Sequence, residues 1–215
     1  MTKNIIPTIN ISPIVKNGFD NSKSIIAINK IRKACINIGF FQITGHGINQ
    51  KDNWVSLLQE EFYKEGTSLK LINSSVSGDT TSGGLERLKE DLKISNPDYV
   101  LIELGGNDAL RGYPVKKIKD NLKQMISLVK ANNSKPLLMQ IRIPPNYGQK
   151  YTYAFEKIYV DLALAENINL LPFMLENIGV NSDLMQSDGI HPNKKAQEMI
   201  AKNVKKNLNK VLFFK

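Results

Sequence analysis

The chain has 215 residues, of which 41% are apolar, and its formal net charge is +9 at pH 7. This length is typical of one α/β domain, and no apolar run approaches the length that spans a bilayer. The single cysteine, Cys35, excludes an internal disulfide and a cysteine-based metal cluster. The lysines are spread along the chain and are not interleaved with aromatic residues, so we expect no nucleic-acid partner.

The first fifty residues predict a strand, a helix and a second strand. Residues 5–11 alternate like a short edge strand, and residues 22–38 carry apolar side chains at helical spacing. Gly39 is expected to end that helix, and residues 40–44 form an apolar strand before a turn. The first residues lack the basic and apolar segments of a signal peptide, so we expect a cytoplasmic location.

After about residue 68, strand and helical patterns alternate regularly. Near-continuous apolar strands that alternate with amphipathic helices predict a parallel sheet covered on both faces, with the chemistry at the carboxyl ends of the strands. The expected strands are 69–76, 99–104, 136–141 and 168–173. One expected helix starts at Asp52, and the others span 85–94, 115–131, 149–166 and 193–210.

Asp188 and His191 are the most informative pair of residues in the chain. They lie three residues apart, and Pro192 follows directly. An Asp that orients a His, while the His removes a proton from a hydroxyl, forms the general-base half of a serine hydrolase.

Gly78 and Asn107 follow the strands expected at 69–76 and 99–104. A glycine lets the backbone turn sharply and present an N–H, and an asparagine side chain offers a second N–H. Two such donors aimed at one point form an oxyanion hole for acyl transfer. The alternative is that Gly78 and the Gly105-Gly106 pair only shape turns.

Together these motifs resemble those of the SGNH, or GDSL, hydrolase superfamily, most closely its bacterial thioesterase I, lysophospholipase and arylesterase branch. The resemblance covers about residues 53–212, and its motifs are Ser77–Thr80, Leu104–Asp108, Leu138–Gly148 and Asp188–Asn193. It implies a three-layer, flavodoxin-like α/β fold and hydrolysis of acyl esters or thioesters without a cofactor. It also implies that Asp188 and His191 are the acid and base and that Gly78 and Asn107 are the oxyanion donors.

The Gly-Asp-Ser motif that supplies the nucleophile in this superfamily is missing, together with the central first strand that carries it. No serine occurs between Ser24 and Ser56. Ser22 lacks a preceding strand, so the nucleophile is unknown, with Thr44, a water molecule or an unplaced serine as candidates. An empty central position would leave both neighbouring strands unpaired, so we expect residues 40–44 to fill it.

Residues 5–48 resemble the N-terminal region of 2-oxoglutarate- and isopenicillin-N-synthase-type iron oxygenases. In that family the region is a scaffold, and two His and one carboxylate hold the iron elsewhere. This chain has only His46 and His191, and His191 belongs to the hydrolase motif, so an intact iron site is excluded and we expect no metal. The expected division is an oxygenase-like segment, 1–50, and a hydrolase-like domain, 51–215.

We therefore expect an esterase, thioesterase or lysophospholipase whose partner is a small acyl ester or thioester. The missing serine motif makes turnover by this chain doubtful. The alternatives are a non-catalytic fusion or remnant with a hydrolase fold and, third, an oxygenase fragment. The acyl chain length, the leaving group and the oligomeric state stay open. The residues that either shape the acyl groove or only pack are Tyr113, Pro144, Pro145, Tyr147 and Tyr151.

Overall fold

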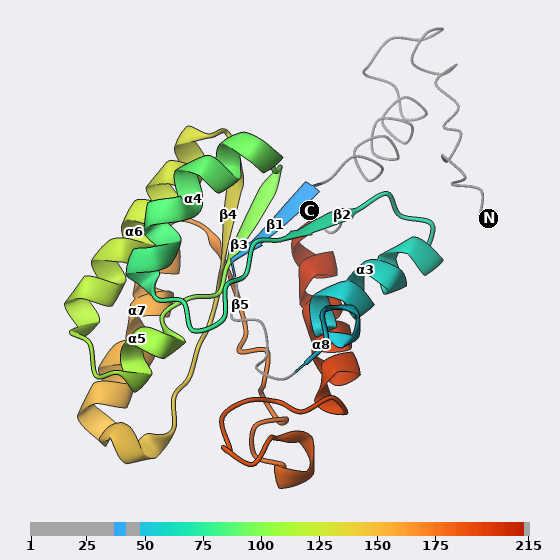
Figure 1. Cartoon of the computed structure of the whole chain (residues 1–215). Coiled ribbons are helices and arrows are strands. Elements are labelled where there is room, and N and C mark those ends of the chain that lie inside the picture. Colours follow the sequence, from blue (N-terminus) through green and yellow to red (C-terminus); the bar gives the residue numbers. More distant parts are fainter. Residues whose placement is uncertain (1–36, 42–47, 213–215) are drawn as a thin grey trace, which may run out of the picture.

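Five parallel strands form one sheet, in the order β2-β1-β3-β4-β5. The computed structural model describes residues 37–41 and 48–212 of the chain (Figure 1). The strands are β1 (Asn37–Phe41), β2 (Lys70–Asn73), β3 (Tyr99–Ile102), β4 (Lys135–Met139) and β5 (Asn169–Leu171). The predicted parallel α/β sheet is confirmed.

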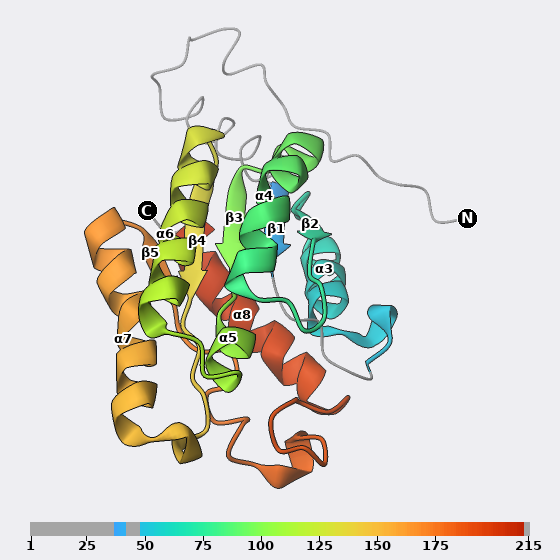
Figure 2. The same cartoon turned by 60° about the vertical axis from the view of Figure 1, so that its left-hand side comes forward.

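Helices cover both faces of this sheet. In Figures 1 and 2, α4, α6 and α7 lie on one face, and α3 and α8 lie together on the other. The α-helices are α3 (Trp54–Lys64), α4 (Thr81–Ser95), α5 (Gly106–Leu110), α6 (Val115–Ala131), α7 (Gln149–Glu166) and α8 (Ala196–Leu212), and the short 3-10 helices are η1 (Gln50–Asp52), η2 (Pro145–Tyr147) and η3 (Ser182–Leu184). The expected three-layer fold is therefore present.

The strands separate two hydrophobic cores, because successive side chains of a strand point to opposite faces. Leu101 and Leu137 pack with the buried faces of α3 and α8. Val100, Ile102 and Leu138 pack with α4, α6 and α7. The central strands are thus apolar on both faces, as expected for a buried parallel sheet.

Strand β1 lies between β2 and β3, in the central position where the superfamily has its first strand. Its register pairs Gly39 with Ile72 of β2 and with Val100 of β3, and Phe41 with Ile102. The prediction that this strand fills the gap is confirmed for Phe40 and Phe41, whereas residues 42–44 lie outside the described residues. A segment that resembles an oxygenase scaffold therefore completes the hydrolase-like sheet.

The predicted helix over 22–38 is wrong at its C-terminal end. Asn37 and Ile38 lie in β1, and Gly39 is a strand residue, not a helix terminator. Pairing with β2 on one side and β3 on the other gives these residues backbone partners, which overrides a local helical pattern. Residues 22–36 lie outside the described residues.

The other boundaries differ little from those predicted. Helices α6 and α7 match their expected ranges, whereas α3 begins at Trp54, because the Asn53 side chain accepts from Ser56 N–H at 2.9 Å. Helix α4 begins at Thr81, four residues earlier than predicted, because Thr80 caps it. Helix α8 begins at Ala196, and β2 and β5 are shorter than expected. Over the described ranges, no helix has the length and apolar character needed to cross a membrane.

Candidate active site

The loop between β5 and α8 presents Asp188 and His191 at the carboxyl end of the sheet. Met185 and Pro192 form an antiparallel bridge, and Gln186 N–H donates to His191 O at 2.7 Å. Gly189 has φ +67°, the left-handed conformation that a residue with a side chain rarely adopts, and it closes the turn between the two sides. The loop is thus a tight hairpin with the predicted acid and base at its tip.

The Asp188 carboxylate holds both the ring and the backbone of His191. Asp188 Oδ2 lies 2.7 Å from His191 Nδ1, and Asp188 Oδ1 accepts from His191 N–H and Ile190 N–H, each at 2.9 Å. The backbone and side-chain hydrogen bonds from His191 lower the pKa of Asp188 from 3.8 to about 2. An ionised carboxylate only accepts hydrogen bonds, so Nδ1 carries the proton and Nε2 is the basic nitrogen.

Gln197 joins this loop to the start of α3. Its Oε1 accepts from Trp54 N–H at 3.1 Å, and its Nε2 donates to Asn193 O at 3.2 Å. Gln197 is buried on α8. The sequence alone does not predict this role, although the spacing of Gln197 from the buried Ala201 places it on the apolar side of the helix.

Gly78 lies in a turn that contacts α5. Asp79 N–H donates to Val76 O at 3.2 Å, and Gly78 has φ +75°. Asn107 Nδ2 donates to Asp79 O at 2.9 Å, and Arg111 Nη2 donates to Gly78 O at 3.2 Å. The structure therefore places the two predicted oxyanion donors on neighbouring segments that are joined by hydrogen bonds.

Asn107 reaches the site because the chain turns sharply after β3. Gly105 has φ +118°, and a Cβ there would lie 2.5 Å from the Tyr159 hydroxyl. That hydroxyl is buried and donates to Leu104 O at 2.8 Å, and burial raises the pKa of Tyr159 well above its usual range. Only glycine fits this close approach. The turn at Gly105 leads directly into α5 and places Asn107 at the carboxyl end of the sheet.

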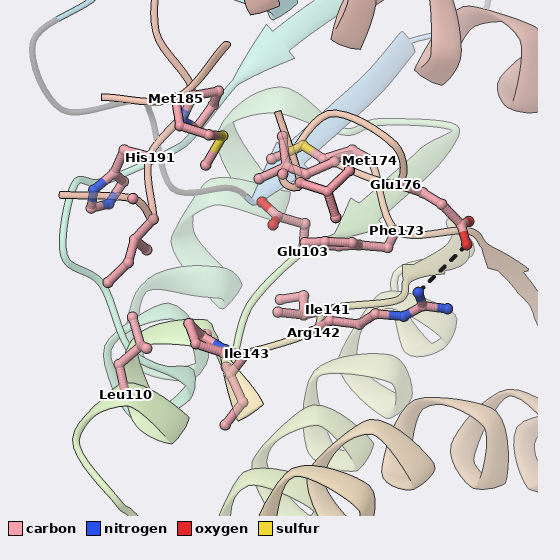
Figure 3. Close-up of a pocket in the computed structure, with 18 of the residues that line it drawn as sticks. Glu103, Leu110, Ile141, Arg142, Ile143, Phe173, Met174, Glu176, Met185 and His191 are labelled. Atoms are coloured by element: carbon pink, nitrogen blue, oxygen red, sulfur yellow. Dashed lines mark ion pairs between the residues drawn. The ribbon is translucent and has the colours of Figure 1, made fainter. Parts of the chain in front are cut away.

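A pocket of about 490 Å³ opens between these loops, and Asn107 and His191 both line it. Its wall is largely apolar, and Arg142 and Glu176 form an ion pair of 3.5 Å beside it (Figure 3). The apolar residues labelled in Figure 3 are Leu110, Ile141, Ile143, Phe173, Met174 and Met185. The site thus combines a hydrogen-bonded base, an amide donor and an apolar cavity.

The pocket separates the predicted groove residues into two groups. Pro144 and Pro145 line it, whereas Tyr113, Tyr147 and Tyr151 are not among its described lining residues. The Tyr151 hydroxyl donates to the backbone O of Tyr113 at 2.6 Å, and both side chains pack against the core on the α4, α6 and α7 face. Gly78 is also not among the described lining residues, and it adjoins the pocket through Asp79 and Asn107.

The described lining residues include carboxylates but no hydroxyl or thiol side chain. Glu103 is a buried carboxylate at the end of β3, and the sequence analysis did not single it out. The candidate nucleophile Thr44 lies outside the described residues, as do Ser22, His46 and Cys35. Within residues 37–41 and 48–212, no three His, Cys, Asp or Glu side chains lie together in a way that could hold a metal ion.

Comparison with known proteins identifies hydrolases that are similar over most of this chain. The arylesterase of Vibrio mimicus is 45% identical over 168 residues, which are 78% of this chain and 84% of that protein. Thioesterase 1/protease 1/lysophospholipase L1 of Escherichia coli K12 is 44% identical over 157 residues, 73% of this chain and 74% of that protein. The psychrotrophic esterase EstA of Pseudoalteromonas sp., in a structure inhibited by monoethylphosphonate, superposes with a TM-score of 0.81 at 40% identity, covering 83% of this chain and 99% of that one.

Two family profiles match overlapping parts of the sequence. The N-terminal profile of the non-haem dioxygenases in morphine synthesis matches residues 6–67, in agreement with the oxygenase-like N-terminal segment. The profile of the GDSL-like lipase/acylhydrolase family matches residues 42–199 and so covers most of the chain. By that match and by the identity to the relatives above, the chain belongs to the GDSL-like lipase/acylhydrolase family.

Proposed function

We propose that this chain hydrolyses acyl esters or thioesters in the pocket between Asn107 and His191. The observation that carries the proposal is that an Asp188-bound imidazole and the Asn107 amide line one apolar cavity. An acyl chain fits an apolar wall, and the reacting carbonyl needs a base and an amide donor beside it. Relatives named as arylesterase, esterase and thioesterase support the same reaction class.

In the proposed reaction, His191 Nε2 accepts the proton of a hydroxyl group, whose oxygen attacks the acyl carbonyl carbon. The carbonyl oxygen becomes an oxyanion, which accepts hydrogen bonds from the second N–H of Asn107 and from Gly78 N–H. The protonated His191 then donates its proton to the leaving oxygen or sulfur as the acyl bond breaks. Asp188 keeps the ring in the required tautomer and stabilises its positive charge.

The candidates for the attacking hydroxyl are Thr44, a water molecule and a serine that is not yet placed in the site. Thr44 carries the single hydroxyl among residues 42–47, the stretch that follows β1 in the chain. With Thr44, an acyl-enzyme forms and water then hydrolyses it; with water, the acid and the alcohol or thiol form in one displacement. A fluorophosphonate distinguishes these routes, because it labels an activated side-chain hydroxyl and not a water molecule.

One observation favours a second function, the binding of acyl compounds without turnover. None of the described pocket residues supplies a hydroxyl or thiol. Loss of a triad nucleophile typically removes several orders of magnitude in rate and leaves the contribution of the oxyanion site. The cavity and its Asn107 amide would still bind an acyl group in that case.

Turnover and labelling together test the proposal. The purified full chain is given p-nitrophenyl butyrate or palmitoyl-CoA, and a fluorophosphonate-treated sample is analysed by peptide mass spectrometry. Turnover with a label on Thr44 or on a serine supports the acyl-enzyme route and names the nucleophile, and turnover without a label supports direct attack by water. No turnover of either substrate above buffer overturns the proposed hydrolysis and leaves the binding function.

A further inference from the structure

A buried pair of hydrogen bonds joins the start of α4 to α5, next to the proposed oxyanion donors. Asp108 Oδ2 accepts from Thr81 N–H at 2.8 Å, and Asp108 Oδ1 accepts from the Thr81 hydroxyl at 2.6 Å. Both residues have a relative exposure of 0%. A carboxylate is costly to bury unless donors compensate it, so this arrangement holds Asp108 in one place.

Asn121 of α6 fixes the direction of these hydrogen bonds. Its Nδ2 donates to Thr81 Oγ1 at 2.9 Å and to Ser82 Oγ at 3.1 Å. Because the Thr81 oxygen accepts from Asn121, its own proton is directed to Asp108. The chain of donors therefore runs from Asn121 through Thr81 to Asp108, and each of these buried polar side chains has a partner.

A second connection lies parallel to the first. Asn107, the neighbour of Asp108, donates to Asp79 O, and the Asp79 carboxylate accepts from Arg87 Nε at 3.1 Å and Nη2 at 2.9 Å. Two consecutive residues of α5 are thus tied to Asp79, which directly follows Gly78, and to Thr81, two residues further along the chain. Two parallel connections restrict both the distance and the angle between the Gly78 turn and α5.

We infer that Thr81 and Asp108 are positioning residues for acyl transfer, because they fix the separation of the Gly78 and Asn107 donors. The inference rests on the proposed function, in which these two groups stabilise the oxyanion. Such donors act only when they are held within about 0.5 Å of the productive geometry, by neighbours that are themselves locked. A buried carboxylate and a buried hydroxyl provide that rigidity immediately beside both donors.

Substitution of Thr81 tests the connection. Thr81→Val keeps the shape of the side chain and removes the hydroxyl, whereas Thr81→Ser keeps the hydroxyl. We expect Thr81→Val to lower kcat for p-nitrophenyl butyrate about tenfold with little change in KM, since the oxyanion exists only in the transition state. Thr81→Ser should restore most of that kcat.

A reversal of the hydrogen-bond chain gives a second, independent test. Asp108→Asn places two amide donors against the Thr81 hydroxyl, and Asn121→Asp places two carboxylate acceptors against it. Each single variant should therefore have a lower kcat than the wild type. In the double variant, the amide at position 108 donates to Thr81, and Thr81 donates to the carboxylate at position 121. The double variant should therefore recover kcat relative to both single variants.

The matched control is Ser134→Ala, which removes a buried 2.6 Å hydrogen bond to Pro97 O. Ser134 directly precedes β4, at the end of the strand opposite to the carboxyl end that faces the site. Thermal unfolding and the ¹⁵N NMR signals of the Gly78 amide and the Asn107 side chain are measured for every variant. We expect Thr81→Val, and not Ser134→Ala, to move both signals.

If the wild type shows no turnover, the proposed function fails, and these signals still decide the positioning role. Equal loss of melting temperature in both variants, with the two signals unchanged, would overturn the inference.

Discussion

Asp188 Oδ2 lies 2.7 Å from His191 Nδ1, and the same carboxylate accepts the His191 backbone N–H. One side chain therefore fixes both the position and the tautomer of the proposed base. The hairpin between Met185 and Pro192 carries the pair, and Asn193 Oδ1 accepts from Lys195 N–H at 2.9 Å at the start of α8. The geometry of the base is thus set locally, between Met185 and Lys195.

Asp188→Asn should lower kcat about 10³- to 10⁴-fold, because the amide can donate to Nδ1 and so favour the wrong tautomer of His191. The change is measured with p-nitrophenyl butyrate at a saturating concentration. The matched control is Asp183→Asn, a change of an exposed carboxylate in the same loop. An unchanged kcat in Asp188→Asn would contradict the role given to Asp188.

The lowered pKa of Asp188 predicts how the stability of the fold depends on pH. The pKa of Asp188 is lowered from 3.8 to about 2 in the folded protein, so its ionised form stabilises the fold. This contribution is complete above the unfolded pKa and is lost as the pH falls through 3.8 towards about 2. Urea unfolding should therefore show a stability difference between wild type and Asp188→Asn at pH 6 that shrinks towards pH 2. A difference that grows in acid would have the wrong sign.

Asn107→Ala should lower kcat about 10²- to 10³-fold with a smaller effect on KM, because an oxyanion donor acts mainly in the transition state. Asn207→Ala is the control, since Asn207 also donates its side-chain amide to a backbone carbonyl, that of Asn203, at 2.9 Å. Both variants lose one amide hydrogen bond, but only Asn107 lines the pocket. Similar kinetics for the two variants would remove Asn107 from the proposed oxyanion site.

Much of this fold was predictable because long amphipathic helices alternate with apolar strands. The ranges of α6 and α7 match the prediction, and the Asp188–His191 pair is close in sequence as well as in space. The start of α4 was missed because Gly83 and Gly84 resemble a loop. Local periodicity predicts a helix at Asn37 and Ile38, because it does not contain the long-range pairing with β2 and β3.

The parts of the site that were not predicted depend on distant contacts. Gln197 joins α8 to Trp54 across 143 residues of sequence, and Thr81 meets Asp108 across 27. No spacing rule connects such positions. The offset of Gly78 from the pocket wall has the same origin, because the turn is placed by Asn107 and Arg111 of another element.

Gly105→Ala should destabilise the fold by more than about 2 kcal/mol, since both the positive φ and the close Tyr159 hydroxyl oppose a Cβ. Tyr159→Phe alone should cost about 1 kcal/mol, for the lost hydrogen bond to Leu104 O. In the Tyr159→Phe background the Gly105→Ala penalty should be smaller, because the clashing oxygen is gone. Equal penalties in both backgrounds, measured by urea unfolding, would show that the hydroxyl contact is not the cause.

The comparison of wild type with His191→Ala in p-nitrophenyl butyrate hydrolysis decides whether His191 is the base for ester hydrolysis. Met199→Ala, at an exposed position of α8 that does not line the pocket, serves as the control. We expect wild type and Met199→Ala to hydrolyse the ester at similar rates, and His191→Ala to fall to the rate in buffer. Equal rates for His191→Ala and wild type would contradict this expectation.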